Sequence, residues 1–368
     1  MFKRIVVMLV VLSVDAWAAD TATTVRERNQ QYGEALERYL RHHLVDQYPD
    51  RAARLWHRSY DSVEAFLRSV EPNRERYRRF LAVPELTPSG SAERKAFPAI
   101  SDLQAEWIRI PLGGVDAEGL LVIPTSATGP VPLVIAQHGI DSFPEKVFGL
   151  EDERNLYHDY GHALVRAGFA VLAPLNLSSV EKRNRIERLT RLAGATLPGL
   201  EFRRMQLLLD EAVKDQRIDS ERIGFWGISL GGMAGMFWTP LEPRIQCAIV
   251  TAWFNHRRNK MAVPDARYSC FLETEEDHAF FDGWLTEFTD SDVASLVCPR
   301  PLLIQHGKAD RIAWWPQVEE EFAEARRHYE MLGLVERIEL DLHDGGHEIR
   351  LESGLSFLRR WLKQDRAQ

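Results

Sequence analysis

Short apolar runs alternate with amphipathic stretches through the C-terminal two thirds of the chain, and this alternation restricts the fold more than any other feature. The strand-like runs are too short to be helices and cover residues 131–136, 170–175, 223–227, 245–251, 301–305 and 338–343. The helix-like stretches between them include residues 156–167, 202–213, 317–331 and 355–362. Such alternation predicts an α/β fold, with a mostly parallel central sheet and helices on both faces.

The N-terminal third of the chain has a different pattern, in which apolar residues recur at helical spacing. Tyr32, Leu36, Leu40 and Leu44 recur every four residues, so residues 21–80 are predicted to be helical. Within them, Asp61 and Glu64 have the spacing of a capping box, and residues 84–91 are rich in Pro, Gly and Ser, which is typical of a linker. Residues 106–110 and 119–123 flank a Gly-Gly pair and predict an antiparallel hairpin.

The first 19 residues predict a signal peptide. Lys3 and Arg4 are followed by an apolar run at residues 5–14, and residues 16–18 read Ala-Trp-Ala, with small residues at the two positions that signal peptidase reads. Cleavage would deliver the protein to the periplasm or the medium; an uncleaved N-terminal anchor is the alternative. Since no later run approaches about 18 apolar residues, no membrane span is expected after cleavage.

Charge and cysteine content narrow the partners and the redox chemistry. The net charge is −8 at pH 7, which gives a nucleic-acid partner no electrostatic support, so none is expected. Cys247, Cys270 and Cys298 allow at most one disulfide and leave one thiol over. Cys247 lies in an apolar run, which favours a buried thiol. The sequence carries no indication of oligomeric state.

One short motif carries a chemical prediction. Residues 227–231 read Gly-Ile-Ser-Leu-Gly, the G-x-S-x-G pattern that places a serine on a tight turn between a strand and a helix. The context fits, because the buried run 223–227 precedes the motif and an apolar helical stretch at 233–237 follows it. We predict that Ser229 is a nucleophile; the alternative is a glycine-rich turn without chemistry.

A serine hydroxyl needs a general base, and the base needs an acid that orients it. In folds that carry this motif, the acid and then the histidine come later in the chain. Asp310 follows the run at 301–305, and His347 follows the run at 338–343. Both therefore fall at C-terminal strand ends, where an open α/β sheet forms its crevice. We predict a catalytic triad of Ser229, Asp310 and His347.

Alternatives to this triad stay open. His343 is a second candidate base, although it falls inside the last strand-like run. Asp344, or an acid from the insertion at residues 254–290, is a second candidate for the acid. That insertion is long, aromatic and acidic, and it reads equally as a lid over the site or as a packed surface helix.

A tetrahedral intermediate also needs hydrogen-bond donors for its oxyanion. The backbone N–H of Leu230 is one predicted donor, and the N–H of Ile140, in the loop after the run at 131–136, is the other. In the same loop, His138 and Asp141 are candidate substrate contacts, although His138 reads more readily as a histidine that braces the loop. Trp253 and Trp314 follow strand ends or a triad loop and are further candidate contacts, although core packing is the ordinary role of such residues.

Pairs of histidines four residues apart raise the question of a metal. His158 and His162 have helical spacing, but residue 159 is Asp and residue 161 is Gly, which departs from the zinc-protease pattern H-E-x-x-H. His343 and His347 straddle a strand end, where helical spacing has no meaning. We predict no metal site.

Taken together, residues 103–362 resemble the α/β-hydrolase superfamily, in its dienelactone-hydrolase and acetylxylan-esterase-like branch. The resemblance rests on His138-Gly139, on residues 222–232 around Ser229, on the run Pro-Arg-Pro-Leu-Leu-Ile at 299–304 and on Asp-Gly-Gly-His-Glu at 344–348. It implies the α/β-hydrolase fold and an enzyme without a cofactor. Dienelactone hydrolases proper use a cysteine nucleophile where Ser229 stands here, so their substrate is not expected.

These features lead us to expect a signal peptide (residues 1–19), a helical N-terminal extension (20–92) and a catalytic domain (93–368) in which 254–290 is an insertion. The expected activity is serine carboxylic-ester hydrolysis of short acyl esters, on a small molecule or an acetylated carbohydrate. One alternative is a serine peptidase of the prolyl-oligopeptidase type, although residues 20–92 are too short for its propeller. The other is an inactive binding protein with the same fold.

Overall fold

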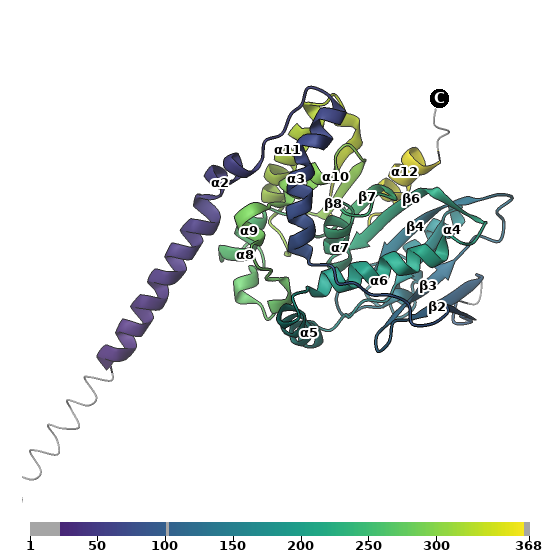
Figure 1. Ribbon diagram of the computed structural model, residues 1–368, viewed down its shortest axis with the longest axis horizontal. Helices are drawn as coiled ribbons and strands as arrows, with labels where there is room; N and C mark the ends of the chain where they lie inside the picture. The colour runs from purple at the N-terminus through teal and green to yellow at the C-terminus, as the bar shows by residue number, and fades with distance from the viewer. Residues whose placement is uncertain (1–22, 101–102, 364–368) are drawn as a thin grey trace, which may run out of the picture.

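A single nine-stranded sheet forms the centre of the computed structural model, which describes residues 23–100 and 103–363 (Figure 1). The predicted signal peptide lies outside these residues. The strand order is β1-β2-β3-β5-β4-β6-β7-β8-β9. The strands are β1 (Glu93–Ala96), β2 (Ala105–Pro111), β3 (Asp116–Val122), β4 (Val131–Gln137), β5 (Ala170–Pro174), β6 (Ile218–Ile228), β7 (Ile245–Thr251), β8 (Leu302–Gly307) and β9 (Ile338–His343).

The strand pairing confirms a mostly parallel sheet. Pairing is antiparallel from β1 to β3 and between β3 and β5, and it is parallel in every other pair. The predicted hairpin is β2–β3, with Trp107 opposite Leu120. Two strand features escaped prediction: β1 is an additional edge strand, and β6 begins at Ile218 rather than at residue 223.

Helices cover both faces of the sheet and enclose a separate core on each. One core contains side chains of α3 (Val63–Leu81), α6 (Leu197–Ala212), α7 (Leu230–Trp238), α10 (Asp290–Val297) and α11 (Trp315–Glu330). The other contains side chains of α4 (Tyr160–Arg166) and α12 (Leu351–Leu362). Because side chains alternate along a strand, Phe225 of β6 enters the first core and Trp226 the second.

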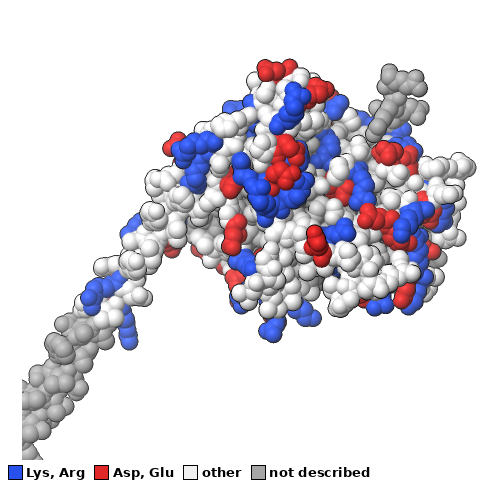
Figure 2. All heavy atoms as spheres, viewed as in Figure 1, with Lys and Arg blue, Asp and Glu red and all other residues white. Residues whose placement is uncertain are grey.

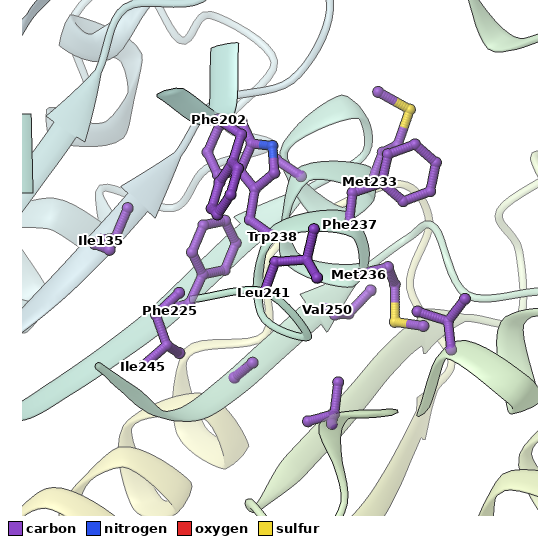
Figure 3. Close-up of a cluster of buried hydrophobic side chains, with 14 of the residues drawn as sticks. Ile135, Phe202, Phe225, Met233, Met236, Phe237, Trp238, Leu241, Ile245 and Val250 are labelled. Carbon is purple, nitrogen blue, oxygen red and sulfur yellow. The ribbon is translucent and has the colours of Figure 1, made fainter. Parts of the chain in front are cut away.

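The helix that follows the serine motif is buried on every side. All nine residues of α7 are buried, as expected of a helix that is apolar all round. Figure 3 shows Phe237 and Trp238 of α7 among Phe202 of α6, Phe225 of β6 and Val250 of β7. This packing fixes the N-terminus of α7, and with it the position of Ser229, relative to the sheet.

One helix prediction needs correction, and one helix was not predicted. The stretch predicted at 156–167 becomes helical only at Tyr160, because Asn155, His158 and Asp159 have positive φ angles, which end or delay a right-handed helix. The helix α5 (Val180–Leu192) was not predicted, since its sequence is mainly charged. Its start is capped by the Ser179 hydroxyl, which accepts the Lys182 N–H at 3.3 Å.

The N-terminal residues are helical but not as one continuous element. Residues 23–41 form a helix that projects from the body (Figure 1) and leads into η1 (His42–Asp46) and α2 (Tyr48–Leu55), and the chain leaves the helix at residues 56–62. The predicted cap is wrong by one position: Ser62, not Asp61, begins α3 by accepting the Ala65 N–H at 3.1 Å.

The insertion at residues 254–290 packs against the N-terminal helices. It contains α8 (Arg257–Ala262), two short 3-10 turns, η3 (Phe271–Glu273) and η4 (Asp277–Ala279), and α9 (Trp284–Glu287). Trp284 lies 5.0 Å from Phe80 of α3 and 4.8 Å from Phe237 of α7, measured between ring centroids. The remaining short turns of the fold are η2 (Pro144–Phe148) and η5 (Val335–Arg337).

Three further observations bear on the sequence predictions. All three cysteines are buried and free, which agrees with the buried thiol predicted for Cys247. Among the described residues, no helix has the length and apolar content needed to cross a membrane. On the face shown in Figure 2, basic and acidic side chains are interspersed.

Candidate active site

Ser229 occupies a strained turn between β6 and α7. Its φ is 59° and its ψ is −118°, a region that non-glycine residues rarely adopt and that is common at functional sites. The turn is held from both sides, because Ser229 N–H donates to Thr251 O at 2.9 Å and Ser229 O accepts the Met233 N–H at 2.9 Å. This is the strand–turn–helix geometry that the motif predicts.

The glycines around Ser229 are required by close backbone approaches. A Cβ at Gly227 would overlap the carbonyl oxygen of Gly231, and a Cβ at Gly231 would overlap the carbonyl oxygen of Gln137 at the end of β4. A Cβ at Gly232 would lie 2.7 Å from the carbonyl oxygen of Thr251. The turn therefore closes only with residues that lack a side chain at these positions.

His347 and Asp310 form a hydrogen-bonded pair. His347 Nδ1 lies 2.7 Å from Asp310 Oδ2, and Asp310 Oδ1 accepts the Ile312 N–H at 2.9 Å. Burial alone would raise the pKa of Asp310, but the hydrogen bond and positive charge offered by His347, together with the Ile312 N–H, lower it overall. Asp310 is therefore ionised at neutral pH and orients the imidazole so that Nε2 is free to act.

The rival triad residues lie elsewhere. His343 is the last residue of β9, its side chain is largely buried, and its Nδ1 accepts the Gly345 N–H at 3.2 Å. The Asp344 side chain is 95% exposed and pairs with Lys308 at 3.2 Å. The geometry thus favours His347 and Asp310 over these alternatives.

Ser229 and His347 line one cavity of about 360 Å³. Its other lining residues are Gly139, Ile140, Asp141, Ser142, Lys146, Glu151, Asp152, Glu153, Arg154, Leu156, Tyr157 and Ile228. Within residues 23–100 and 103–363, the side chains of Asp141, Lys146, Glu151, Glu153 and Arg154 take part in none of the ion pairs. Charged groups that are not neutralised by each other are available to a polar ligand.

The two predicted oxyanion donors lie beside Ser229. Leu230 is the first residue of α7, so its N–H has no acceptor within the helix. The Ile140 N–H has no backbone acceptor in the part of the chain that the structure describes. The loop that carries Ile140 reaches the nucleophile, because a Cβ added to the preceding Gly139 would lie 3.3 Å from Ser229 Cβ.

His138 braces this loop from behind. It is fully buried, its Nδ1 lies 2.9 Å from Gly139 O, and its Nε2 accepts the Asn176 N–H at 3.1 Å. Burial lowers the pKa of His138 to about 4, so the ring is neutral at physiological pH. The side chain does not line the Ser229 cavity, whereas Asp141 does.

The two predicted tryptophan contacts are not brought to this cavity. The Trp253 ring lies under the Arg257 guanidinium at 4.2 Å, and the Trp314 ring lies under that of Arg267 at 3.8 Å. Neither tryptophan is among the lining residues of the Ser229 cavity. Their sequence position near strand ends therefore does not translate into a position on its wall.

One wall of the cavity is formed by residues 151–157, a segment that was not predicted from the sequence to be part of the site. A helix was predicted to begin at residue 156, but the Asp152 carboxylate instead accepts the N–H groups of Leu156 and Tyr157 at 3.1 and 2.8 Å. The acidic and basic run at 151–154, which carries no helical apolar stripe, was the available signal.

The two histidines of the candidate metal pair contact separate carboxylates. His158 Nε2 lies 2.8 Å from Glu348 Oε2, and His162 pairs with Asp159. Among the described residues, no group of three or more His, Cys, Asp and Glu side chains is arranged to hold a metal ion.

No protein-family model matches the chain, and neither does the sequence of any curated protein. Solved structures do share its architecture. A Bacteroides fragilis protein assigned as an acetyl xylan esterase is 17% identical, with a TM-score of 0.62 over 79% of this chain and 80% of its own. A glucuronoyl esterase from Solibacter usitatus is 14% identical, with a TM-score of 0.61 over 82% and 94%.

A carbohydrate esterase family 15 glucuronoyl esterase from Caldicellulosiruptor kristjansonii is 16% identical, with a TM-score of 0.55 over 84% of this chain and 91% of its own. At these identities the likeness establishes the fold. The chain has an α/β-hydrolase fold with a mostly parallel sheet, as its sequence predicted. The dienelactone-hydrolase branch is not confirmed by these neighbours.

Proposed function

We propose that the protein is a serine esterase that hydrolyses carboxylic esters through an acyl-enzyme on Ser229. The observation that carries the proposal is the hydrogen-bonded pair of His347 and Asp310, whose imidazole lines the same cavity as a serine on a strained strand–helix turn. A structural serine has no need of that turn or of an oriented base.

The geometry supports a two-step reaction. Ser229 Oγ attacks the ester carbonyl carbon while His347 Nε2 accepts the hydroxyl proton, and Asp310 stabilises the imidazolium. The N–H groups of Leu230 and Ile140 stabilise the oxyanion. Collapse of the tetrahedral intermediate breaks the carbon–alkoxide bond, and His347 returns the proton to the leaving alkoxide. Water, activated by His347, then attacks the acyl-enzyme and regenerates Ser229.

The lining of the cavity favours a short acyl group on a polar carrier. Asp141, Lys146 and Arg154 border the space next to Ser229, and such charged groups disfavour a long alkyl chain but suit the hydroxyls of a sugar. Solved structures of this fold include proteins named as acetyl xylan and glucuronoyl esterases, which supports a carbohydrate ester as substrate. We further propose export, on the basis of the signal-peptide pattern, which would bring the enzyme to such substrates.

Hydrolysis of p-nitrophenyl acetate, butyrate and octanoate by residues 20–368, beside the Ser229→Ala variant, tests the proposal. We expect turnover that is fastest for the acetate and absent in the variant, because Oγ is the nucleophile. If neither protein hydrolyses any ester, or if the variant retains activity, the esterase proposal is wrong. In that case, hydrolysis of peptide substrates would distinguish a peptidase from an inactive binding protein. If the esterase proposal holds, acetylated xylan tests whether the natural substrate is a carbohydrate ester.

A further inference from the structure

The phenol of Tyr157 lies on the wall of the Ser229 cavity, beside the loop that carries the predicted oxyanion donor Ile140. The side chain is 5% exposed and lines the cavity together with Ser229 and His347. A Cβ placed on Gly139 would lie 3.2 Å from Tyr157 Oη and 3.3 Å from Ser229 Cβ. The phenol oxygen and Ser229 therefore both lie close to Gly139, which directly precedes the predicted oxyanion donor Ile140.

The hydrogen bonding of this phenol leaves its proton available. Gly139 N–H donates to Tyr157 Oη at 2.8 Å, so the oxygen already acts as an acceptor. A phenol also carries one hydrogen to donate. Within residues 23–100 and 103–363, no hydrogen bond is donated by this phenol. The Ser142 hydroxyl on the same wall lowers the pKa of Tyr157, as a donor to the phenol oxygen does, so it does not take up the phenol hydrogen.

We propose that the Tyr157 hydroxyl is a third donor to the oxyanion, beside the N–H groups of Leu230 and Ile140. This inference rests on the esterase function proposed above. As the bond from Ser229 Oγ to the carbonyl carbon forms, negative charge grows on the carbonyl oxygen, and Tyr157 O–H donates a hydrogen bond to it. No proton leaves the phenol, and the hydrogen bond weakens again when the carbonyl re-forms.

The surroundings keep the phenol protonated and in place. Burial raises the pKa of Tyr157, and the Ser142 hydroxyl and Gly139 N–H offset this only in part, so the phenol stays protonated at neutral pH. The backbone of Tyr157 is tied to the Asp152 carboxylate, and the next residue, His158, is tied to Glu348 beside the catalytic histidine. A donor held in this way reaches the transition state without reorganisation.

The variant Tyr157→Phe tests the proposal, with Tyr160→Phe as its matched control. Tyr160 is a fully buried neighbour whose ring lies 6.2 Å from that of Tyr157 and whose hydroxyl is directed to Trp226 O, away from the lining of the cavity. We expect kcat on p-nitrophenyl acetate to fall about 10²-fold in Tyr157→Phe, with KM within threefold, since the donor acts on the transition state. Tyr160→Phe should keep the wild-type kcat.

A trifluoromethyl ketone, which forms a hemiketal oxyanion on the serine, distinguishes donation from positioning. Donation predicts that its affinity for Tyr157→Phe falls by the same factor as kcat/KM. Wild-type turnover in Tyr157→Phe, or a fall in turnover with unchanged ketone affinity, would overturn the proposal. If Tyr157→Phe melts early, incorporation of 3,5-difluorotyrosine at position 157 replaces it: a more acidic phenol should bind the ketone more tightly, and unchanged binding contradicts donation.

Ser229→Ala separates this inference from the proposed function. Residual turnover in Ser229→Ala would refute both. A silent Ser229→Ala beside a fully active Tyr157→Phe would leave the esterase in place and remove only the role of Tyr157.

Discussion

Replacing Asp310 by Asn tests how the triad is oriented, because the amide keeps the shape of the carboxylate but offers one acceptor in place of two. Both carboxylate oxygens are in use: Oδ2 contacts His347 Nδ1, and Oδ1 accepts the Ile312 N–H. An asparagine side chain can satisfy only one of these partners with its oxygen, so either orientation carries a penalty.

The two possible orientations of the introduced amide set the range of the expected fall in kcat. With the amide NH₂ toward His347, the imidazole is held in the tautomer that carries its hydrogen on Nε2, which cannot accept a proton from Ser229; such a change costs about 10⁴-fold in kcat. With the oxygen toward His347, the NH₂ group opposes the Ile312 N–H, and a buried donor without a partner costs about 1–3 kcal/mol, or about 5- to 150-fold. Because the charge that stabilises the imidazolium is also lost, we expect kcat to fall about 10²- to 10⁴-fold.

Steady-state hydrolysis of p-nitrophenyl acetate by residues 20–368 measures this loss. Asp344→Asn is the matched control, since Asp344 is the rival acid and its exposed side chain pairs only with Lys308 among the described residues. We expect that variant to stay within threefold of the wild type. A loss below 10-fold in Asp310→Asn, or a larger loss in Asp344→Asn, would refute the assignment of the acid.

Three further predictions concern stability and can be read from urea unfolding. Gly231→Ala should lower the free energy of unfolding by about 2 kcal/mol or more, because the added Cβ overlaps a backbone carbonyl oxygen. Gly33→Ala should not lower it, since a Cβ added at Gly33 has no atom within 4 Å. Equal effects of the two variants would contradict this packing argument. Arg257→Met should cost about 3–5 kcal/mol, because it leaves the buried Asp290 carboxylate with the Asn255 N–H but without its cationic partner. A loss under about 1 kcal/mol would show that the pair is not desolvated. Burial raises the pKa of Glu321 to about 7, so the contribution of this side chain to the free energy of unfolding is fully present below pH 4 and is lost as the pH rises through 7. Glu321→Gln should therefore be more stable than the wild type at pH 8 by up to about 3 kcal/mol and should lose this advantage at pH 4. A stability difference that does not change with pH would argue against a neutral buried carboxyl.

Much of the fold was predictable because buried strands and helices have characteristic patterns of apolar residues in the sequence. The parallel strands β4, β7 and β8 are buried on both faces and appear as continuous apolar runs. The elements that were not predicted lack such an apolar pattern. The strand β1 lies at the sheet edge and is largely exposed, and α5 is a mainly charged helix whose start is defined by a single serine cap.

The candidate site was predictable to the extent that it follows strand order. Asp310 and His347 sit at the ends of neighbouring strands, so their order in the chain was sufficient to bring them together. Tyr157 lies instead in a segment without regular secondary structure, in which Asn155 and His158 have positive φ angles, and such a segment leaves no periodic signal in the sequence. Trp253 follows a strand end but does not line the Ser229 cavity, because a strand end does not specify which way the following side chain turns.

The most direct test of the central claim is covalent labelling of Ser229. The folded protein, residues 20–368, is treated with a fluorophosphonate, digested and mapped by peptide mass spectrometry, with His347→Ala and urea-unfolded protein as controls. We predict one adduct on Ser229 in the folded protein and almost none in either control, since the oxyanion donors and the base act only in the assembled site. An adduct on another residue, or no adduct on the folded protein, would contradict the account.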